Sequence, residues 1–234
     1  NNINDYFLIQ SDGRLYLHVT NALSASSPFW ALGRIDLCGC PQQCGSIKNS
    51  AETGVFVSDS PAVLTVNQGA GANNPQAHAF VCTFQGQAGL RKLGEKDLTV
   101  NSANPTEGSL EAAGGNLFIS ATGSWNGTDV RVTGRDAVLG LRGSANLRRE
   151  ASLAITDPEA RVDLADGVEQ RIAHLYLPVL SDPDPETGAV TTNLVEATAG
   201  TWGSPGSAAE NKSAFFTGTG LVKTGKFGLL ILVR

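Results

Sequence analysis

Hydrophobic and polar positions alternate along many short segments of this chain, which predicts β-strands joined by turns. The clearest example is YFLIQSDGRLYLHVT, residues 6–20, in which two alternating apolar runs flank Asp12-Gly13. An Asp-Gly pair can adopt the positive φ angles of a type I′ turn, so this segment predicts a β-hairpin. By the same reasoning GVFVSDSPAVLTV, residues 54–66, predicts a hairpin that turns at residues 59–61.

Two more turn signals of this kind occur in the second half of the chain. Asn126-Gly127 and Asp166-Gly167 each lie between alternating apolar runs, and each predicts a hairpin. The Gly-containing turns fall at unequal spacing, and no strict internal repeat emerges. We therefore expect neither a propeller nor a solenoid.

Strands that recur at short intervals, with turn residues between them, predict an all-β fold. We expect an antiparallel β-sandwich or a jelly-roll-like architecture with at most one or two short helices. The composition shifts in NPTEGSLEAAGG, residues 104–115, where a short helix over 106–113 is expected. This stretch is also the best candidate for a subdomain boundary within a single β-rich domain, residues 1–234.

Composition agrees with this picture and excludes some functions. The 234 residues include 27 glycines and no methionine, as expected for many strands and tight turns rather than packed helices. A formal net charge of −5 argues against a nucleic-acid partner. The apolar run LLILV, residues 229–233, is too short to span a membrane.

Four cysteines could be thiols, disulfides or metal ligands. Cys38, Cys40 and Cys44 are close in sequence, and Cys82 lies far from them. Zinc sites usually present C-x2-C pairs, which this spacing does not match. In an oxidising setting we favour two disulfides, Cys40–Cys44 with Cys38–Cys82 or the swapped pairing, and in a reducing one we expect structural thiols.

An acidic loop, SDPDPETG, supplies the one candidate metal site. Asp182, Asp184 and Glu186 could offer oxygen ligands to a calcium ion. Prolines at 183 and 185 prevent the glycine-mediated wrap of an EF-hand, so the alternative is a rigid, exposed acidic loop. No other cofactor is predicted.

No signature of an enzyme is visible. The three histidines, His18, His78 and His174, lie in or beside strand-like segments, and no nucleophile motif such as G-x-S-x-G accompanies them. No set of motifs identifies a family. We therefore expect a protein that is not an enzyme.

Both ends of the chain carry apolar strand segments. Chain ends fray unless they are tied down, and exposed apolar edge strands invite pairing with another chain. Either segment could be a strand of the protein's own sheet, or it could complete the sheet of a neighbouring subunit. The candidate subunit contacts are Tyr6, Phe7, Leu8 and Ile9 at one end and Phe227, Leu229, Leu230, Ile231 and Leu232 at the other.

These features together predict a structural subunit that assembles with copies of itself. The expected setting is a virion (a capsid, decoration or tail-tube protein) or an extracellular filament, with strand pairing and apolar burial between subunits. The alternative is a secreted carbohydrate-binding β-sandwich. In that case Trp30, Trp125 and Trp202, which lie beside turn-like residues, could form a sugar-binding platform.

Overall fold

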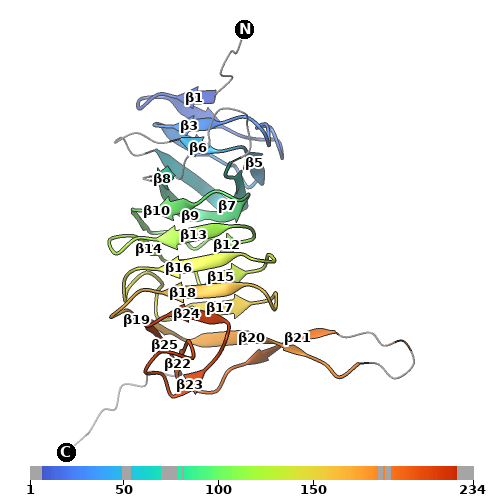
Figure 1. Ribbon diagram of the computed structural model, residues 1–234. Helices are drawn as coiled ribbons and strands as arrows, with labels where there is room; N and C mark the ends of the chain where they lie inside the picture. The colour runs from blue at the N-terminus through green and yellow to red at the C-terminus, as the bar shows by residue number, and fades with distance from the viewer. Residues whose placement is uncertain are drawn as a thin grey trace, which may run out of the picture.

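The chain folds as a β-solenoid, a stack of coils in which each coil lies on the one before it (Figure 1). The computed structural model describes residues 7–48, 54–69, 78–80, 82–183, 187 and 191–225. Within these residues every regular element is a β-strand, and there is no helix. The prediction of an all-β protein is therefore confirmed.

Two long sheets run along the stack, and three short sheets complete it. The long sheet consists, in spatial order, of β2 (Arg14–Tyr16), β4 (Arg34–Asp36), β7 (Val55–Asn67), β9 (Thr83–Leu93), β12 (Leu110–Ala112), β15 (Asp129–Val132), β17 (Ser152–Ile155), β20 (His174–Leu180) and β21 (Thr192–Glu196), with β5 (Gln42–Cys44) paired to β7. The second sheet consists of β24 (Phe216–Gly218), β18 (Arg161–Leu164), β16 (Val138–Leu141), β13 (Asn116–Ile119), β10 (Leu98–Val100) and β8 (His78–Phe80).

The short sheets lie at both ends of the stack and along its third side. They are formed by β1 (Phe7–Ile9), β3 (Phe29–Ala31) and β6 (Ile47–Lys48), by β11 (Ala103–Asn104) and β14 (Ser124–Trp125), and by β19 (Glu169–Ile172), β25 (Leu221–Thr224), β22 (Gly200–Gly203) and β23 (Asn211–Lys212).

Strand pairing contradicts the predicted sandwich or jelly roll. From β6 to β20, strands that follow one another in sequence lie in different sheets, and they pair in parallel with strands of the neighbouring coils. Paired positions are 19 residues apart at Leu98 and Leu117 and 23 apart at Leu139 and Val162. Among the described pairs only β20–β21 and β22–β25 are antiparallel. The expectation that the chain is not a solenoid was also wrong.

The predicted hairpins are corners of coils. Around Asp12-Gly13, β1 pairs with β3 and β2 pairs with β4, so the two flanking strands never pair with each other. A type I′ turn needs a positive φ at both central residues, and no Asp or Asn of the three turns has one. Only Gly167 has the left-handed conformation, with φ = 73°. The backbone therefore turns from one sheet to the next instead of reversing.

Two other local predictions also fail. Residues 54–66 form no hairpin, because 55–67 are the single strand β7, whose register against β9 shifts between Ser58 and Ala62. Pro61 lies inside this shift, where a missing backbone N–H is tolerated. No helix forms over 106–113, which instead includes β12.

The glycine-rich composition reflects how closely the coils approach one another. A Cβ atom placed on Gly127 would lie 1.9 Å from the carbonyl oxygen of Gly108 in the preceding coil. A Cβ on Gly108 would lie 2.2 Å from the oxygen of Ala88, and one on Gly134 would lie 2.0 Å from that of Ala113. At these positions glycine is required because the neighbouring backbone fills the space of a side chain.

The core consists of columns of side chains that repeat from coil to coil. One column, contributed by the long sheet, contains Leu90, Leu110, Val130, Leu153 and Leu175, all of them fully buried. A second column is aromatic. The ring centroids of Phe56 and Phe84 are 5.2 Å apart, and those of Phe84 and Trp125 are also 5.2 Å apart. Burial of these columns is the main stabilising contribution to the stack.

Buried amide side chains bind the backbone at the corners of the stack. Asn146 is fully buried, and its Oδ1 accepts hydrogen bonds from the N–H groups of Arg142 and Gly143 at 2.8 and 2.7 Å. Its Nδ2 donates to the carbonyls of Ser120 and Gly123, both at 2.7 Å. One side chain thus provides partners for four backbone groups, which satisfies the requirement that buried polar groups be paired.

Candidate functional site

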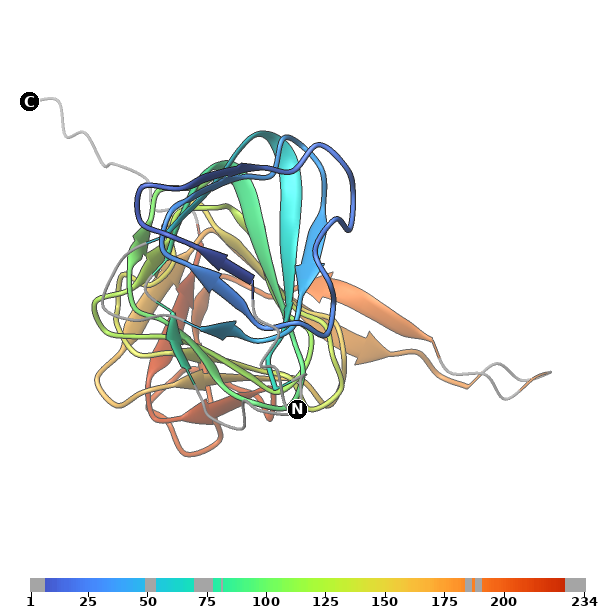
Figure 2. The ribbon, with the colours of Figure 1, turned by 90° about the horizontal axis from the view of Figure 1, so that it is seen from above.

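A two-stranded arm projects from the stack, formed by β20 and β21 (Figures 1 and 2). Its strands are antiparallel, with Leu177 opposite Val195 and Val179 opposite Asn193. Seen along the stack, the arm leaves the side of the coils and extends away from them (Figure 2). The arm is therefore the element of the described structure that is positioned to reach another molecule.

Both faces of the arm expose aliphatic side chains. Val179, Leu180, Leu194 and Val195 are 47 to 57% exposed. Because side chains alternate across a strand, Leu180 and Leu194 lie on one face and Val179 and Val195 lie on the other. An isolated two-stranded hairpin is at best marginally stable in water. These side chains are therefore candidates for burial against a partner.

The base of the arm is tied to the stack by the parallel pairing of β20 with β17. His174 Nδ1 lies 2.5 Å from Glu196 Oε1, across the two strands, and Leu177 is buried. Tyr176 and Leu194 line a groove of about 440 Å³ on the outer surface of the long sheet. The other residues that line this groove are Asp129, Arg131, Ser152, Ala154 and Thr156. The arm and the groove thus form one continuous surface.

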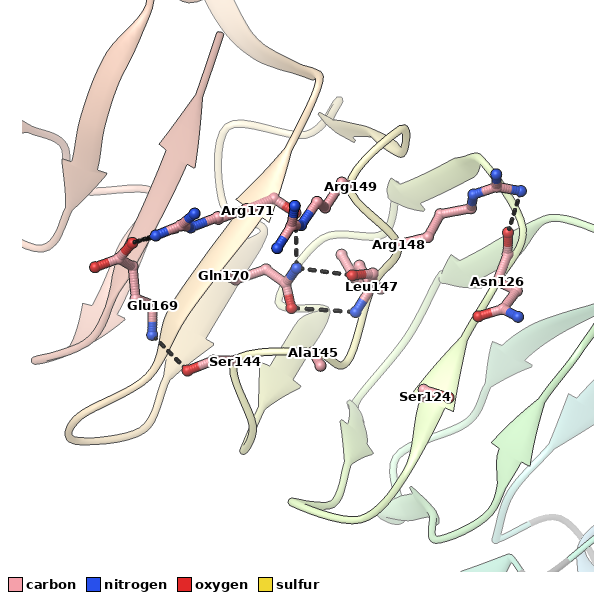
Figure 3. Close-up of a pocket in the computed structure, with 10 residues that line it drawn as sticks. All are labelled: Ser124, Asn126, Ser144, Ala145, Leu147, Arg148, Arg149, Glu169, Gln170 and Arg171. Carbon is pink, nitrogen blue, oxygen red and sulfur yellow. Dashed lines mark hydrogen bonds and ion pairs between the residues drawn. The ribbon is translucent and has the colours of Figure 1, made fainter. Parts of the chain in front are cut away.

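A second groove, of about 500 Å³, lies on the third side of the stack and is rich in arginine (Figure 3). Its residues come from β14 and the turn after it, from the loop over 144–149, and from β19. They are Ser124, Asn126, Ser144, Ala145, Leu147, Arg148, Arg149, Glu169, Gln170 and Arg171. We call this the arginine groove.

The floor of the arginine groove is fixed by a buried glutamine. Gln170 Oε1 accepts a hydrogen bond from the N–H of Leu147 at 3.1 Å, and its Nε2 donates to the carbonyl of Leu147 at 2.9 Å. Ser144 Oγ accepts a hydrogen bond from the N–H of Glu169 at 2.9 Å. These bonds join the loop to β19 and hold the groove in a defined shape.

The cysteines lie in two environments, and no disulfide joins any of the four in this structure. Cys38 and Cys40 are partly buried at a turn, whereas Cys44 and Cys82 are fully buried in the core. Burial raises the pKa of the Cys44 thiol, and the neighbouring Cys82 raises it further. Burial also raises the pKa of Cys38, with an added contribution from its hydrogen bond to Asp36. The two disulfide pairings remain predictions.

Thiol labelling tests this arrangement. For reduced, native protein we expect at most two thiols, Cys38 and Cys40, to react with a disulfide reagent such as DTNB, because only these two have access to solvent. All four should react after denaturation, and Cys38→Ser should lower the native count by one. Labelling of Cys44 or Cys82 in folded protein would contradict this. Fewer than four thiols in unreduced, denatured protein would demonstrate a disulfide.

The terminal segments fall only partly within the described residues. Leu8 is 38% exposed, Ile9 packs against the core, and both belong to β1, as does Phe7. The other predicted contact residues lie outside the described residues: Tyr6, Phe227, Leu229, Leu230, Ile231 and Leu232. Their role in subunit contacts remains a prediction.

The predicted calcium loop lies beyond the end of β20. Asp182 is exposed, whereas Asp184 and Glu186 lie outside the described residues. Within the part of the chain that the structure describes, no three His, Cys, Asp or Glu side chains form a group that could hold a metal ion. The same part contains no helix of the length and apolar character needed to cross a membrane.

The three tryptophans do not share a surface. Trp125 is fully buried, and its Nε1 donates to the carbonyl of Gly108 at 2.9 Å. Trp202 packs against the core and donates to the carbonyl of Thr198 at 2.9 Å. A platform that includes Trp125 is therefore excluded by its burial.

The arm and the arginine groove were not predicted as sites. A signal for the arm is present in the sequence: the apolar segments LPVL, residues 177–180, and NLVE, residues 193–196, flank the acidic loop. The groove has no such signal, because its residues come from three separate segments. Comparisons with protein-family models, curated proteins and solved structures found no match to this chain.

Proposed function

We propose that this protein is a non-enzymatic structural subunit that associates with copies of itself through the β20–β21 arm. The observation that carries the proposal is the exposure of four aliphatic side chains on the two faces of the arm. A group of exposed apolar side chains on a projecting element favours a protein contact. The expected setting is a virion or an extracellular filament.

The outer edge of β21 supports a second copy as the partner. β21 is the last strand of the long sheet among the described residues, so one edge of it carries no neighbour there. Its sequence, TNLVE, contains neither the lysine nor the proline by which natural proteins commonly protect an edge strand. Two copies related by a two-fold axis can pair β21 with β21 in antiparallel orientation.

Such pairing would also cover the aliphatic side chains. It would join two marginal two-stranded arms into one four-stranded sheet, in which Leu194 and Val195 of each copy lie beside those of the other. The groove at the base of the arm, with Tyr176 and Ala154 in its lining, can receive apolar side chains from the partner. The mechanism is backbone pairing combined with apolar burial.

Light scattering after size-exclusion chromatography tests the proposal. We expect the protein to have a mass of two or more chains, each of 24.3 kDa, with or without reductant. The double variant Leu194→Lys, Val195→Lys should have the mass of one chain, because two charges on the edge strand oppose pairing. Both changes are on the exposed arm, so the circular dichroism spectrum of the variant should still be that of a folded β protein.

Val19→Ser is the matched control. Val19 is also an exposed aliphatic residue, at 68%, but it lies far from the arm, so this variant should stay assembled. A parent protein with the mass of one chain would overturn the proposal. A double variant that remains assembled would show that the arm is not the contact.

A further inference from the structure

We propose that the arginine groove binds an acidic oligosaccharide through the carboxylates of its sugars. The proposal is independent of self-association, because it concerns a different surface from the arm. Three observations carry it: an excess of positive charge, one arginine that makes no hydrogen bond or ion pair with the described residues, and a groove of small-ligand size whose lining residues are mainly polar and include no aromatic residue.

The charge at the groove is opposite in sign to the charge of the protein. The positively charged residues at and beside the groove are Arg148, Arg149, Arg171 and Lys223. The negatively charged ones are Glu150 and Glu169. Two positive charges are therefore in excess here, on a chain with a formal net charge of −5. Such a local reversal attracts an anionic ligand.

The arginines differ in their pairing. Arg148 Nε lies 2.9 Å from Glu150 Oε2, and Arg171 Nη2 lies 3.1 Å from Glu169 Oε1. Arg149 makes no hydrogen bond or ion pair with any described residue, although it lines the same groove (Figure 3). Its guanidinium therefore keeps all its donors for a ligand, and a carboxylate matches their fork geometry.

The rest of the lining suits hydroxyl groups. The side chains of Ser124 and Asn126 form no hydrogen bond within the described part of the chain, and both line the groove. Hydroxyl and amide groups of this kind can donate to and accept from sugar hydroxyls. A volume of about 500 Å³ lies within the range of small-ligand sites.

Other anionic or sugar ligands fit less well. A single-stranded nucleic acid stacks its bases on aromatic side chains, and none lines this groove. Neutral sugars commonly use the same kind of aromatic platform. A groove lined by arginines and by no aromatic residue therefore favours a ligand that carries both negative charge and hydroxyl groups. A chain of uronic acids is such a ligand.

Isothermal titration with hexagalacturonate at low salt tests the proposal. We expect saturable binding that weakens as salt is added. We also expect no binding of the same hexamer after its carboxylates are methyl-esterified. Arg149→Gln should weaken binding by about tenfold or more, since it removes a charge-assisted pair. The fold should persist, because Arg149 is exposed and makes no contact of these kinds in the described structure.

Arg135→Gln is the matched control. Arg135 is also exposed, pairs with Glu159, and does not line the groove, so its loss removes the same charge elsewhere. Affinity in this variant should equal that of the parent. The proposal is overturned if the parent does not bind hexagalacturonate, if it binds the ester equally well, or if both variants weaken binding alike. Tighter binding of a single-stranded oligonucleotide would overturn it in favour of a phosphate chain.

Discussion

Asn146→Leu is expected to lower the free energy of unfolding by at least about 3 kcal/mol, because four backbone groups lose their partner at once. The leucine is similar in size but can neither accept from the N–H groups of Arg142 and Gly143 nor donate to the two carbonyls that Asn146 now binds. A buried donor or acceptor left unpaired costs about 1–3 kcal/mol, and whole domains have only about 5–15 kcal/mol of stability.

Equilibrium unfolding in urea, followed by circular dichroism, measures this effect. Asn146→Asp keeps the two acceptor bonds, but it loses the two donor bonds and places a buried carboxylate oxygen against the carbonyls of Ser120 and Gly123, so it should also destabilise the fold at neutral pH. Asn126→Leu is the control: it makes the same change at an exposed position away from the arm, where the amide side chain makes no hydrogen bond within the described part of the chain, and it should alter stability by no more than about 0.5 kcal/mol. A loss below about 1 kcal/mol in Asn146→Leu would show that water or a shifted backbone replaces the amide.

Trp125→Ala is expected to lower the free energy of unfolding by about 3–5 kcal/mol, the usual range for removing a large aromatic side chain from a core. Trp125 is fully buried and ends the aromatic column, against Phe84. Its removal leaves a cavity between coils and also frees the carbonyl of Gly108, which accepts the indole N–H.

Two further substitutions separate the contribution of packing from that of the hydrogen bond to Gly108. Trp125→Phe keeps most of the packing and loses the hydrogen bond, so it should cost less than the alanine variant. Trp202→Ala removes a tryptophan that also donates to one carbonyl but is only partly buried, and it should have the smaller effect of the two alanine changes. Equal losses at Trp125 and Trp202 would contradict the importance of the buried column.

The strands themselves could be predicted from the sequence with some accuracy. Alternation in NLFISATGSWNGTDVRVTG corresponds to β13, β14 and β15, with Leu117, Ile119 and Val130 buried as the pattern requires. Alternation works because it reports which side chains point to one face of a strand. It contains no information about which strand lies alongside.

The sequence pattern therefore did not determine which strand pairs with which. The local turn residues suggested pairing between strands that are adjacent in sequence, which was wrong. Asn126-Gly127 suits a hairpin, but Gly127 is required because the oxygen of Gly108 lies where a side chain would be. The coil repeat was also hidden by its varying length. Phe56 is 21 residues from Ile35 and 28 from Phe84, its two partners, so a search for a fixed period fails.

By itself, then, the sequence determined that this protein is built from short strands and close turns, because alternation and glycine content are local properties of the chain. Only the tertiary structure decided that the strands stack in parallel and that the two strands containing Val179 and Val195 project as an arm. It also brought Arg149 into one groove with Asn126 and Arg171. The physical reason is that these features depend on contacts between coils, which join residues about 20 or more positions apart, and no local pattern records such contacts.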